Sequence, residues 1–283
     1  MKKFLKWMGF VVAGLVGIIL IGAVYVYFAS QSEFDRRFEV ASVHVPEIPT
    51  EAAAIAEGER LARMRGCHAC HGQDLSGAVP VDIPNVAKFT APNISGGGRS
   101  FSDAELVAAI RTGVKPDGTS TWLMPSVMFA HMTDENLGQI VAYLRSVPPR
   151  AGIEGGTEMR PIGRAIVAKG DFLSSAREVA ALEEKEMQLD AADPVSHGRY
   201  LAMNLCSECH GQDLNGRPVA HNAPNLAVVK GYSAEAFANF MKDGKALGGR
   251  ELELMSQTAR ERFSVMTPAE VSAMYAFLQA RGS

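Results

Sequence analysis

Cysteine is scarce in this chain of 283 residues, which contains only four. All four belong to two C-x-x-C pairs, one formed by Cys67 and Cys70 and the other by Cys206 and Cys209. No thiol is left over for a further role. Any function that needs an additional cysteine, such as an extra thiolate ligand to a metal, is therefore excluded.

Basic residues are not in excess. Lys and Arg number 28 against 31 Asp and Glu, which gives a formal net charge of −3 at pH 7. Lys2, Lys3 and Lys6 lie at the N-terminus, so the rest of the chain is more acidic. Because a nucleic-acid-binding protein usually presents a basic surface, we expect no nucleic-acid partner. A partner protein with a basic docking face is compatible with this charge.

Convincing period-two alternation of apolar residues is also absent. That alternation indicates half-buried β-strands, whereas apolar residues three and four positions apart indicate helices. Several segments show the helical spacing, and the length suggests about two domains. The sequence therefore predicts an all-α chain.

One long apolar run lies near the N-terminus. Its centre, from Phe10 to Phe28, is about long enough to span a bilayer as a helix. A cleaved signal peptide is the alternative, but its apolar region is shorter and ends at small residues. This run ends in bulky aromatics, so we favour an uncleaved transmembrane anchor that comprises residues 1–32. The lysines then place the N-terminus in the cytoplasm and the rest of the chain on the periplasmic side of a bacterial inner membrane.

A histidine follows each cysteine pair directly. The two motifs are Cys67-His68-Ala69-Cys70-His71 and Cys206-Ser207-Glu208-Cys209-His210. C-x-x-C-H is the attachment site of a c-type haem. Two thiols add across the two vinyl groups of the haem, and the next histidine ligates the iron. The motifs therefore predict two covalently bound haem c groups, with His71 and His210 as iron ligands.

Three other uses of paired cysteines fit less well. The two C-x-x-C pairs of a zinc ribbon usually lie about 15–20 residues apart, far closer than Cys70 and Cys206. A thioredoxin-like motif lies near a βαβ pattern, and neither pair follows a strand-like run. Two disulfides are compatible with an exported protein, but they give no reason for a histidine after each pair.

An internal repeat organises the exported part of the chain. In both copies the haem motif is followed by Gly-Gln-Asp-Leu, by a glycine one residue later and then by Ala-Pro-Asn, which contains Pro92 in the first copy and Pro224 in the second. A middle helix is predicted at 101–114 and at 232–245, and Ser102 and Glu105 form a capping box at the start of the first. Each copy ends in a helix, capped by Thr133 and by Thr267.

The repeat sets the predicted domain boundaries. The connection between the copies is long for a loop and has helix-forming composition at 176–189, so we expect it to wrap across one domain. The predicted parts are an anchor at 1–32, a spacer at 33–49, a first domain at 50–148, a partly helical linker at 149–193 and a second domain at 194–283.

The second axial ligand of each iron is expected among the methionines between the middle and last helices. Methionine ligation raises the reduction potential of a haem. Met124 stands before Pro125, which holds the loop extended, and Met255 occupies the same interval of the second copy. Met128 is the alternative in the first copy. Met132 and Met266 precede helix caps, where apolar packing residues are typical.

The other histidines are weaker ligand candidates. His131 lies beside the last helix of the first copy and is an alternative to Met124. His68 is an interior residue of its motif and is expected to point away from the iron. A surface role is the expectation for the remaining three: His44, His197 and His221.

Each copy resembles a class I cytochrome c domain. The resemblance rests on the order of an N-terminal helix, C-x-x-C-H, a proline-bearing loop, a methionine-bearing loop and a C-terminal helix. Thr90-Ala91-Pro92-Asn93-Ile94 and Met124-Pro125 are similar to cytochrome subunits of periplasmic dehydrogenases, although those usually carry three haems. The resemblance implies proximal ligands, distal methionines and a loop proline that supports each proximal histidine. It also implies a helix crossing at four residues: Gly58, Gly198, Tyr143 and Phe277.

The expected function is electron transfer by a membrane-anchored dihaem cytochrome rather than catalysis. Redox partners of the expected kinds are a dehydrogenase, a quinol-linked complex or a terminal oxidase. Two alternatives stay open. The chain could be a fixed subunit of a dehydrogenase or oxidase complex, or an enzyme in which one haem lacks its methionine ligand and opens to substrate.

Overall fold

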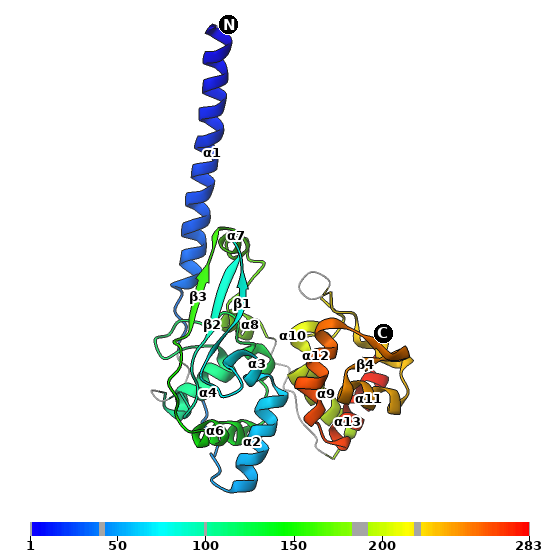
Figure 1. Cartoon of the computed structure of the whole chain (residues 1–283). Helices are drawn as coiled ribbons and strands as arrows, with labels where there is room; N and C mark the ends of the chain where they lie inside the picture. Colours follow the sequence, from blue (N-terminus) through cyan, green and yellow to red (C-terminus); the bar gives the residue numbers. More distant parts are fainter. Residues whose placement is uncertain (1, 40–42, 99–100, 183–191, 218–221, 283) are drawn as a thin grey trace.

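The computed structural model describes residues 2–39, 43–98, 101–182, 192–217 and 222–282. A long N-terminal helix is followed by two helical units that lie side by side and are joined by a linker (Figure 1). The first unit contains α2 to α6 and the second contains α9 to α13. The prediction of a mainly helical chain with an apolar N-terminal helix is confirmed.

Helix α1 (Lys2–Phe34) projects from the first unit (Figure 1). It is long and apolar enough to cross a membrane, and its apolar window is not buried by the rest of the chain. Its last turns pack on α7 (Pro161–Lys169). There the Arg164 guanidinium lies 4.8 Å from the ring centre of Tyr27 and donates to Ser30 Oγ at 2.9 Å. The C-terminal end of α1 is therefore part of the folded structure.

The first unit is built on two crossing helices, α2 (Ala52–Met64) and α6 (Asp134–Ser146). They touch at Gly58, where a Cβ atom would lie only 1.9 Å from the carbonyl oxygen of Gln139. Only glycine allows this approach. Helix α4 (Asp103–Thr112) and the short α5 (Ser126–Phe129) complete the helical part of this unit.

The second unit repeats this crossing with α9 (Pro194–Leu205) and α13 (Pro268–Ala280). A Cβ atom at Gly198 would lie 1.9 Å from the carbonyl oxygen of Ala273 and 2.8 Å from Cβ of Phe277. The predicted crossing of first and last helices is confirmed in both units. The remaining elements are η1 (Leu226–Gly231), α11 (Ala234–Asp243), β4 (Lys245–Ala246), η2 (Leu247–Gly249), β5 (Arg250–Glu251), α12 (Glu253–Glu261) and η3 (Phe263–Val265).

The predicted helix caps are present. Ser102 with Glu105, and Thr267 with Glu270, each form a complete capping box. The Thr133 side chain accepts a hydrogen bond from the backbone N–H of Asn136. These caps satisfy backbone donors at helix starts, which is why the boundaries of α4, α6 and α13 could be read from sequence.

A three-stranded antiparallel sheet was not predicted. Its order is β1 (Ala78–Ile83), β2 (Ala87–Ala91) and β3 (Gly156–Met159). Strand β1 contains Pro80 and has a register irregularity between Ala78 and Val81. Strand β3 is short and largely exposed, so neither strand shows clear alternation. The sheet is a small addition to a mainly helical fold.

The linker lies against the first unit. After β3 and α7, helix α8 (Ser175–Ala180) packs on α4 and α5. The backbone N–H of Ser175 donates to the Thr121 carbonyl at 3.0 Å, and that of Ala176 donates to Ser120 Oγ at 2.9 Å. The second half of the expected helix at 176–189 falls partly on residues 183–191, which lie outside the described residues.

The two units share one hydrophobic cluster. It contains Met64 and Phe129 of the first unit together with Tyr200 and Met266 of the second. A smaller cluster beside α1 and the sheet includes Trp122 and Phe89. The continuous core shows that the two units are packed against each other.

Candidate haem-binding sites

Each cysteine motif forms a short helix directly after the first helix of its unit. The first is α3 (Cys67–His71) and the second is α10 (Ser207–His210), which begins immediately after Cys206. Residues three and four positions apart on a helical turn lie on the same face. The two thiols and the histidine of each motif are therefore presented together, as double attachment plus ligation requires.

The two motif histidines make matching hydrogen bonds. Nδ1 of His71 lies 2.8 Å from the carbonyl oxygen of Pro92, and Nδ1 of His210 lies 2.7 Å from that of Pro224. A carbonyl oxygen can only accept, so Nδ1 must carry the proton in both rings. Nε2 is then the ring nitrogen that would bind a metal. A second partner of this kind also fixes the orientation of a ligating imidazole.

Burial keeps the His71 ring in the form that can ligate. Burial lowers the pKa of His71, and this effect outweighs the opposing effect of the Pro92 carbonyl, which favours the protonated ring. The neighbouring His68 adds to the lowering. His71 is therefore neutral at pH 7, and a neutral imidazole is the metal-binding form.

The turn after each histidine has the same backbone in both units. Leu75 and Leu214 both adopt a left-handed conformation, with φ of 61° and 57°, and both are fully buried. A non-glycine residue in this region costs conformational energy, which burial of the side chain offsets. The N–H groups of Gly77 and Gly216 donate to the carbonyl oxygens of His71 and His210, each at 2.8 Å. The repeat therefore extends to individual dihedral angles.

The four thiols are buried or half-buried and are free in the structure. Burial raises the pKa of Cys67 to about 11 and that of Cys206 to about 12. Burial likewise raises the pKa values of Cys70 and Cys209. Thiols of this kind stay protonated at neutral pH and are poor nucleophiles and poor thiolate ligands. Among the described residues, no group of three or more His, Cys, Asp or Glu side chains could hold a metal ion.

Met124 lies at the start of α5, against the core of the first unit. Pro125 occupies the cap position of α5. The Met124 carbonyl accepts hydrogen bonds from the Ser126 N–H at 2.8 Å and from Ser175 Oγ of the linker at 2.7 Å. The side chain itself is half-buried. The backbone at Met124 is thus held from two sides, one of them supplied by the linker.

Met255 differs from its expected setting. It was expected in a loop that lacks a proline, but it lies in the first turn of α12. Ser256 beside it is fully buried and accepts a hydrogen bond from the Leu252 N–H at 2.7 Å. Met255 is half-buried against the core of the second unit. Met255 is therefore held by a short helix, whereas Met124 is held in a loop that is followed by Pro125.

The rival methionines are more deeply buried. Met128 is 2% exposed, and Met132 and Met266 are packed into the core directly before the helix caps, as their expected packing role requires. The assignment of Met124 in preference to Met128 stays a prediction.

The other histidines have partners or positions of different kinds. Nδ1 of His68 lies 3.0 Å from the Gln73 carbonyl, and its Nε2 lies 3.3 Å from Tyr143 Oη. Nε2 of His44 lies 3.3 Å from Asp134 on the surface. His131 and His197 are half-buried, and His221 lies outside the described residues.

Two arginines near the motifs were not singled out by the sequence analysis. Arg65 precedes the first motif and is 3% exposed, and Arg262 approaches both motifs from α12. Each has a partner in the other unit, more than a hundred residues away: Tyr200 for Arg65 and Met64 for Arg262. No local pattern in the sequence could therefore identify them.

The residues of each unit fit a c-type haem. Each unit contains the donor types that such a group needs: two thiols of one motif, a histidine with Nδ1 already engaged and a half-buried methionine in the following segment. The carbonyl contact at Nδ1 is the kind of second partner that orients a metal-binding imidazole.

Comparison with known proteins agrees with this geometry. The Cytochrome c family profile matches residues 55–148 and 195–281, which together make up more than half of the chain. The two matched stretches coincide with the two units described above. The resemblance noted in the sequence is thereby confirmed.

Curated relatives match over part of their length. The gluconate 2-dehydrogenase cytochrome c subunit of Pantoea cypripedii is 30% identical over 174 residues, which is 56% of this chain and 38% of that relative. The alcohol dehydrogenase (quinone) cytochrome c subunit of Gluconobacter oxydans (strain 621H) is 27% identical over 179 residues, covering 56% of this chain and 35% of the relative. The corresponding subunit of Gluconacetobacter polyoxogenes is 31% identical over 112 residues, which is 36% of this chain and 24% of that relative. The chain spans well under half the length of each.

Proposed function

The chain belongs to the cytochrome c family, and we propose that it carries two covalently bound haems, one in each unit, and passes single electrons between them. The observation that carries this proposal is the matched contact of His71 with Pro92 and of His210 with Pro224. Two units that prepare a histidine in the same way are best explained by two equivalent cofactors.

Each residue has a proposed role. The four cysteines would form the thioether bonds to the haems, and four residues would supply the iron ligands: His71 and Met124 in the first unit, His210 and Met255 in the second. A bound haem supplies an iron that cycles between the ferrous and ferric states. The carbonyl groups of Pro92 and Pro224 orient the two imidazoles and increase their basicity. In this proposal the chain makes and breaks no bonds in a substrate.

The partners follow from the relatives. Those relatives are cytochrome c subunits of a gluconate 2-dehydrogenase and of quinone-linked alcohol dehydrogenases. We propose that this chain likewise accepts electrons from a dehydrogenase and delivers them to a quinone-linked or oxidase partner. The acidic exported part suits a basic docking face.

Helix α1 is proposed to be a permanent anchor in the inner membrane, with the haem units in the periplasm. A removable leader has no need of contacts with the mature domain. Here Glu33 forms an ion pair with Arg177 at 2.9 Å, and Phe34 packs on Trp122 with ring centres 4.5 Å apart. These contacts tie the end of α1 to the first unit, so an anchored α1 would hold that unit close to the membrane. Trp122 lies two residues before Met124.

Affinity isolation tests the proposed partnership. The full chain, tagged at its C-terminus, is solubilised from membranes in a mild detergent, and the proteins that co-purify are identified. We expect a dehydrogenase whose substrate reduces the haems of the isolated material. Isolation of the chain without a dehydrogenase would contradict the proposed assembly. So would a co-purified dehydrogenase whose substrate does not reduce the haems.

A further inference from the structure

The two units meet beside the cysteine motifs. The C-terminal end of α2 leads directly into the first motif, and it contacts the C-terminal end of α12 in the second unit. Arg63 Nε donates to the Glu261 carbonyl at 3.2 Å, and Arg262 Nε donates to the Met64 carbonyl at 3.2 Å. Two reciprocal hydrogen bonds thus join consecutive residues of α2 to consecutive residues at the end of α12.

Arg262 fills the space next to the first motif. A Cβ atom at Gly66 would lie 2.9 Å from Cζ of Arg262, so the guanidinium lies against the backbone just before Cys67. Gly66 has a φ of 82°, which favours glycine independently of this contact. The Arg262 side chain is only 15% exposed.

Arg262 also faces the second motif. Its Nη1 lies 3.7 Å from Oε2 of Glu208, which stands between Cys206 and Cys209. Its Nη2 is buried and has no hydrogen-bond partner among the described residues. One guanidinium therefore touches the segment before one motif and the interior of the other.

Both cysteine motifs lie within electrostatic range of the Arg262 charge. The guanidinium lies against Gly66, directly before Cys67, and 3.7 Å from Glu208, between Cys206 and Cys209. Glu208 carries the opposite charge at the same place.

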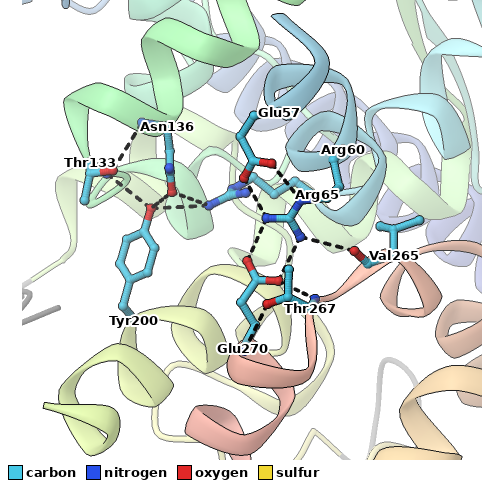
Figure 2. Close-up of polar contacts among 9 residues, drawn as sticks. All are labelled: Glu57, Arg60, Arg65, Thr133, Asn136, Tyr200, Val265, Thr267 and Glu270. Carbon is cyan, nitrogen blue, oxygen red and sulfur yellow. Dashed lines mark hydrogen bonds and ion pairs between the residues drawn. The ribbon is translucent and has the colours of Figure 1, made fainter. Parts of the chain in front are cut away.

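A polar network fixes this arrangement. Figure 2 shows Arg60 of α2 between Glu57 and Glu270, and Arg65 beside Tyr200 and Asn136. The Tyr200 hydroxyl donates to Asn136 Oδ1 at 2.8 Å, so the start of α6 is tied to α9. Both sets of contacts cross between the units on either side of the α2 C-terminus.

We propose that Arg262 is a positioning residue for electron transfer between the two haems, holding their attachment segments together and raising the reduction potentials of both. This inference rests on the proposed presence of one haem in each unit. In the transfer, one iron is oxidised as the other is reduced, and no proton or other group need move. Each haem would be bonded to the cysteines of one of the two motifs that Arg262 approaches.

The sign of the effect follows from charge. Reduction adds an electron to a haem, so a nearby positive charge stabilises the reduced form and raises the potential. The guanidinium is largely shielded from water, so its field is screened much less than that of a surface arginine. The position between both motifs predicts that one substitution moves two potentials.

The test is a redox titration of the detergent-solubilised full chain, with the two haems followed by their absorption. We expect Arg262→Gln to lower both midpoint potentials and Arg262→Lys to restore them in large part, because lysine keeps the charge. Arg260→Gln is the matched control, since Arg260 is 46% exposed on the same helix and pairs with Glu251 within its own unit. It is expected to leave both potentials unchanged.

Glu208→Gln provides an independent variant of opposite sign and is expected to raise both potentials. Unchanged potentials in Arg262→Gln, a fall in only one haem, or no rise in Glu208→Gln would overturn the inference. Haem content measured on the same samples separates this failure from failure of the proposed function. Two haems per chain with unmoved potentials reject only the role of Arg262, whereas fewer than two haems in the unsubstituted chain reject the dihaem proposal.

Discussion

Arg60 and Glu270 form a two-point ion pair that joins the two helical units. Nη1 of Arg60 lies 2.8 Å from Oε2 of Glu270, and Nη2 lies 2.8 Å from Oε1 (Figure 2). Burial on its own would raise the pKa of Glu270, but the hydrogen bonds from Arg60 and Thr267 outweigh it and the pKa is lowered. Paired and hydrogen-bonded in this way, Glu270 is held ionised in the folded chain.

Glu270→Gln is expected to destabilise the folded chain by about 2 kcal/mol, because Arg60 loses its charged inter-unit partner while staying partly buried. The lowered pKa makes the wild-type contribution fully present above the unfolded value of about 4.3 and lost as the pH falls through the folded value. Urea unfolding of the solubilised chain at several pH values measures this difference. The gap between wild type and variant should close only at acid pH.

Glu57→Gln is the matched control for this pair. Glu57 also pairs with Arg60, but it lies on the same helix and is 36% exposed. Its substitution is expected to cost well under 1 kcal/mol. An equal loss of stability in both variants would show that the inter-unit pair has no special weight.

The two helix crossings predict a second result. Gly58→Ala and Gly198→Ala each place a methyl group 1.9 Å from a backbone carbonyl oxygen, so the crossing helices must separate. Each is expected to cost about 3 kcal/mol of stability, although alanine is the better helix former by about 1 kcal/mol. Gly231→Ala, at a site with nothing within 4 Å, serves as control. Denaturant unfolding that finds the three variants equal would refute the crossing.

The distal ligands can be assigned spectroscopically. Met124→Leu and Met255→Leu are each expected to remove about half of the far-red absorption band that is diagnostic of methionine bound to ferric haem. Met128→Leu should leave the band intact. Met255→His is expected to lower the potential of one haem only, because histidine favours the ferric state more than methionine does. A full band in Met255→Leu would show that another residue ligates the second iron.

The anchor proposal predicts the mass of the mature protein. Intact-mass analysis of the chain purified from membranes should include residues 1–34. Phe34→Ala should leave membrane attachment unchanged but make the connection after α1 more accessible to protease, since the contact with Trp122 is lost. A mature chain that lacks these residues and fractionates as a soluble protein would replace the anchor with a leader.

Local features of the sequence predicted the repeated units well. The capping boxes at Ser102 and Thr267 and the motif histidines depend on residues close together in the chain, so their patterns are visible without a structure. Family resemblance implied that Pro92 and Pro224 support the histidines, but the contacts through their carbonyl oxygens were not predicted. Nothing in the spacing of the sequence indicates which backbone atom a histidine will meet.

Contacts between distant segments were not predictable. The sheet arises because β3 reaches back from the linker to pair with β2, and its polar residues give no strand signal. Arg65 contacts Tyr200 and Arg262 contacts Met64 across the interface, and Arg262 also pairs with Glu208 of its own unit. Met255 was expected in a loop that is less constrained than that of Met124, because no proline follows it. Instead, a buried serine beside it stabilises the start of a helix.

The central claim, one haem in each unit, is tested most directly by the haem-to-protein ratio of purified chains with one motif disabled. The account predicts two covalent haems in the unsubstituted chain and one each in Cys67→Ala/Cys70→Ala and Cys206→Ala/Cys209→Ala, as measured by intact mass and by the pyridine haemochrome. A single haem in the wild-type chain would contradict it, and so would two haems in either double-cysteine variant.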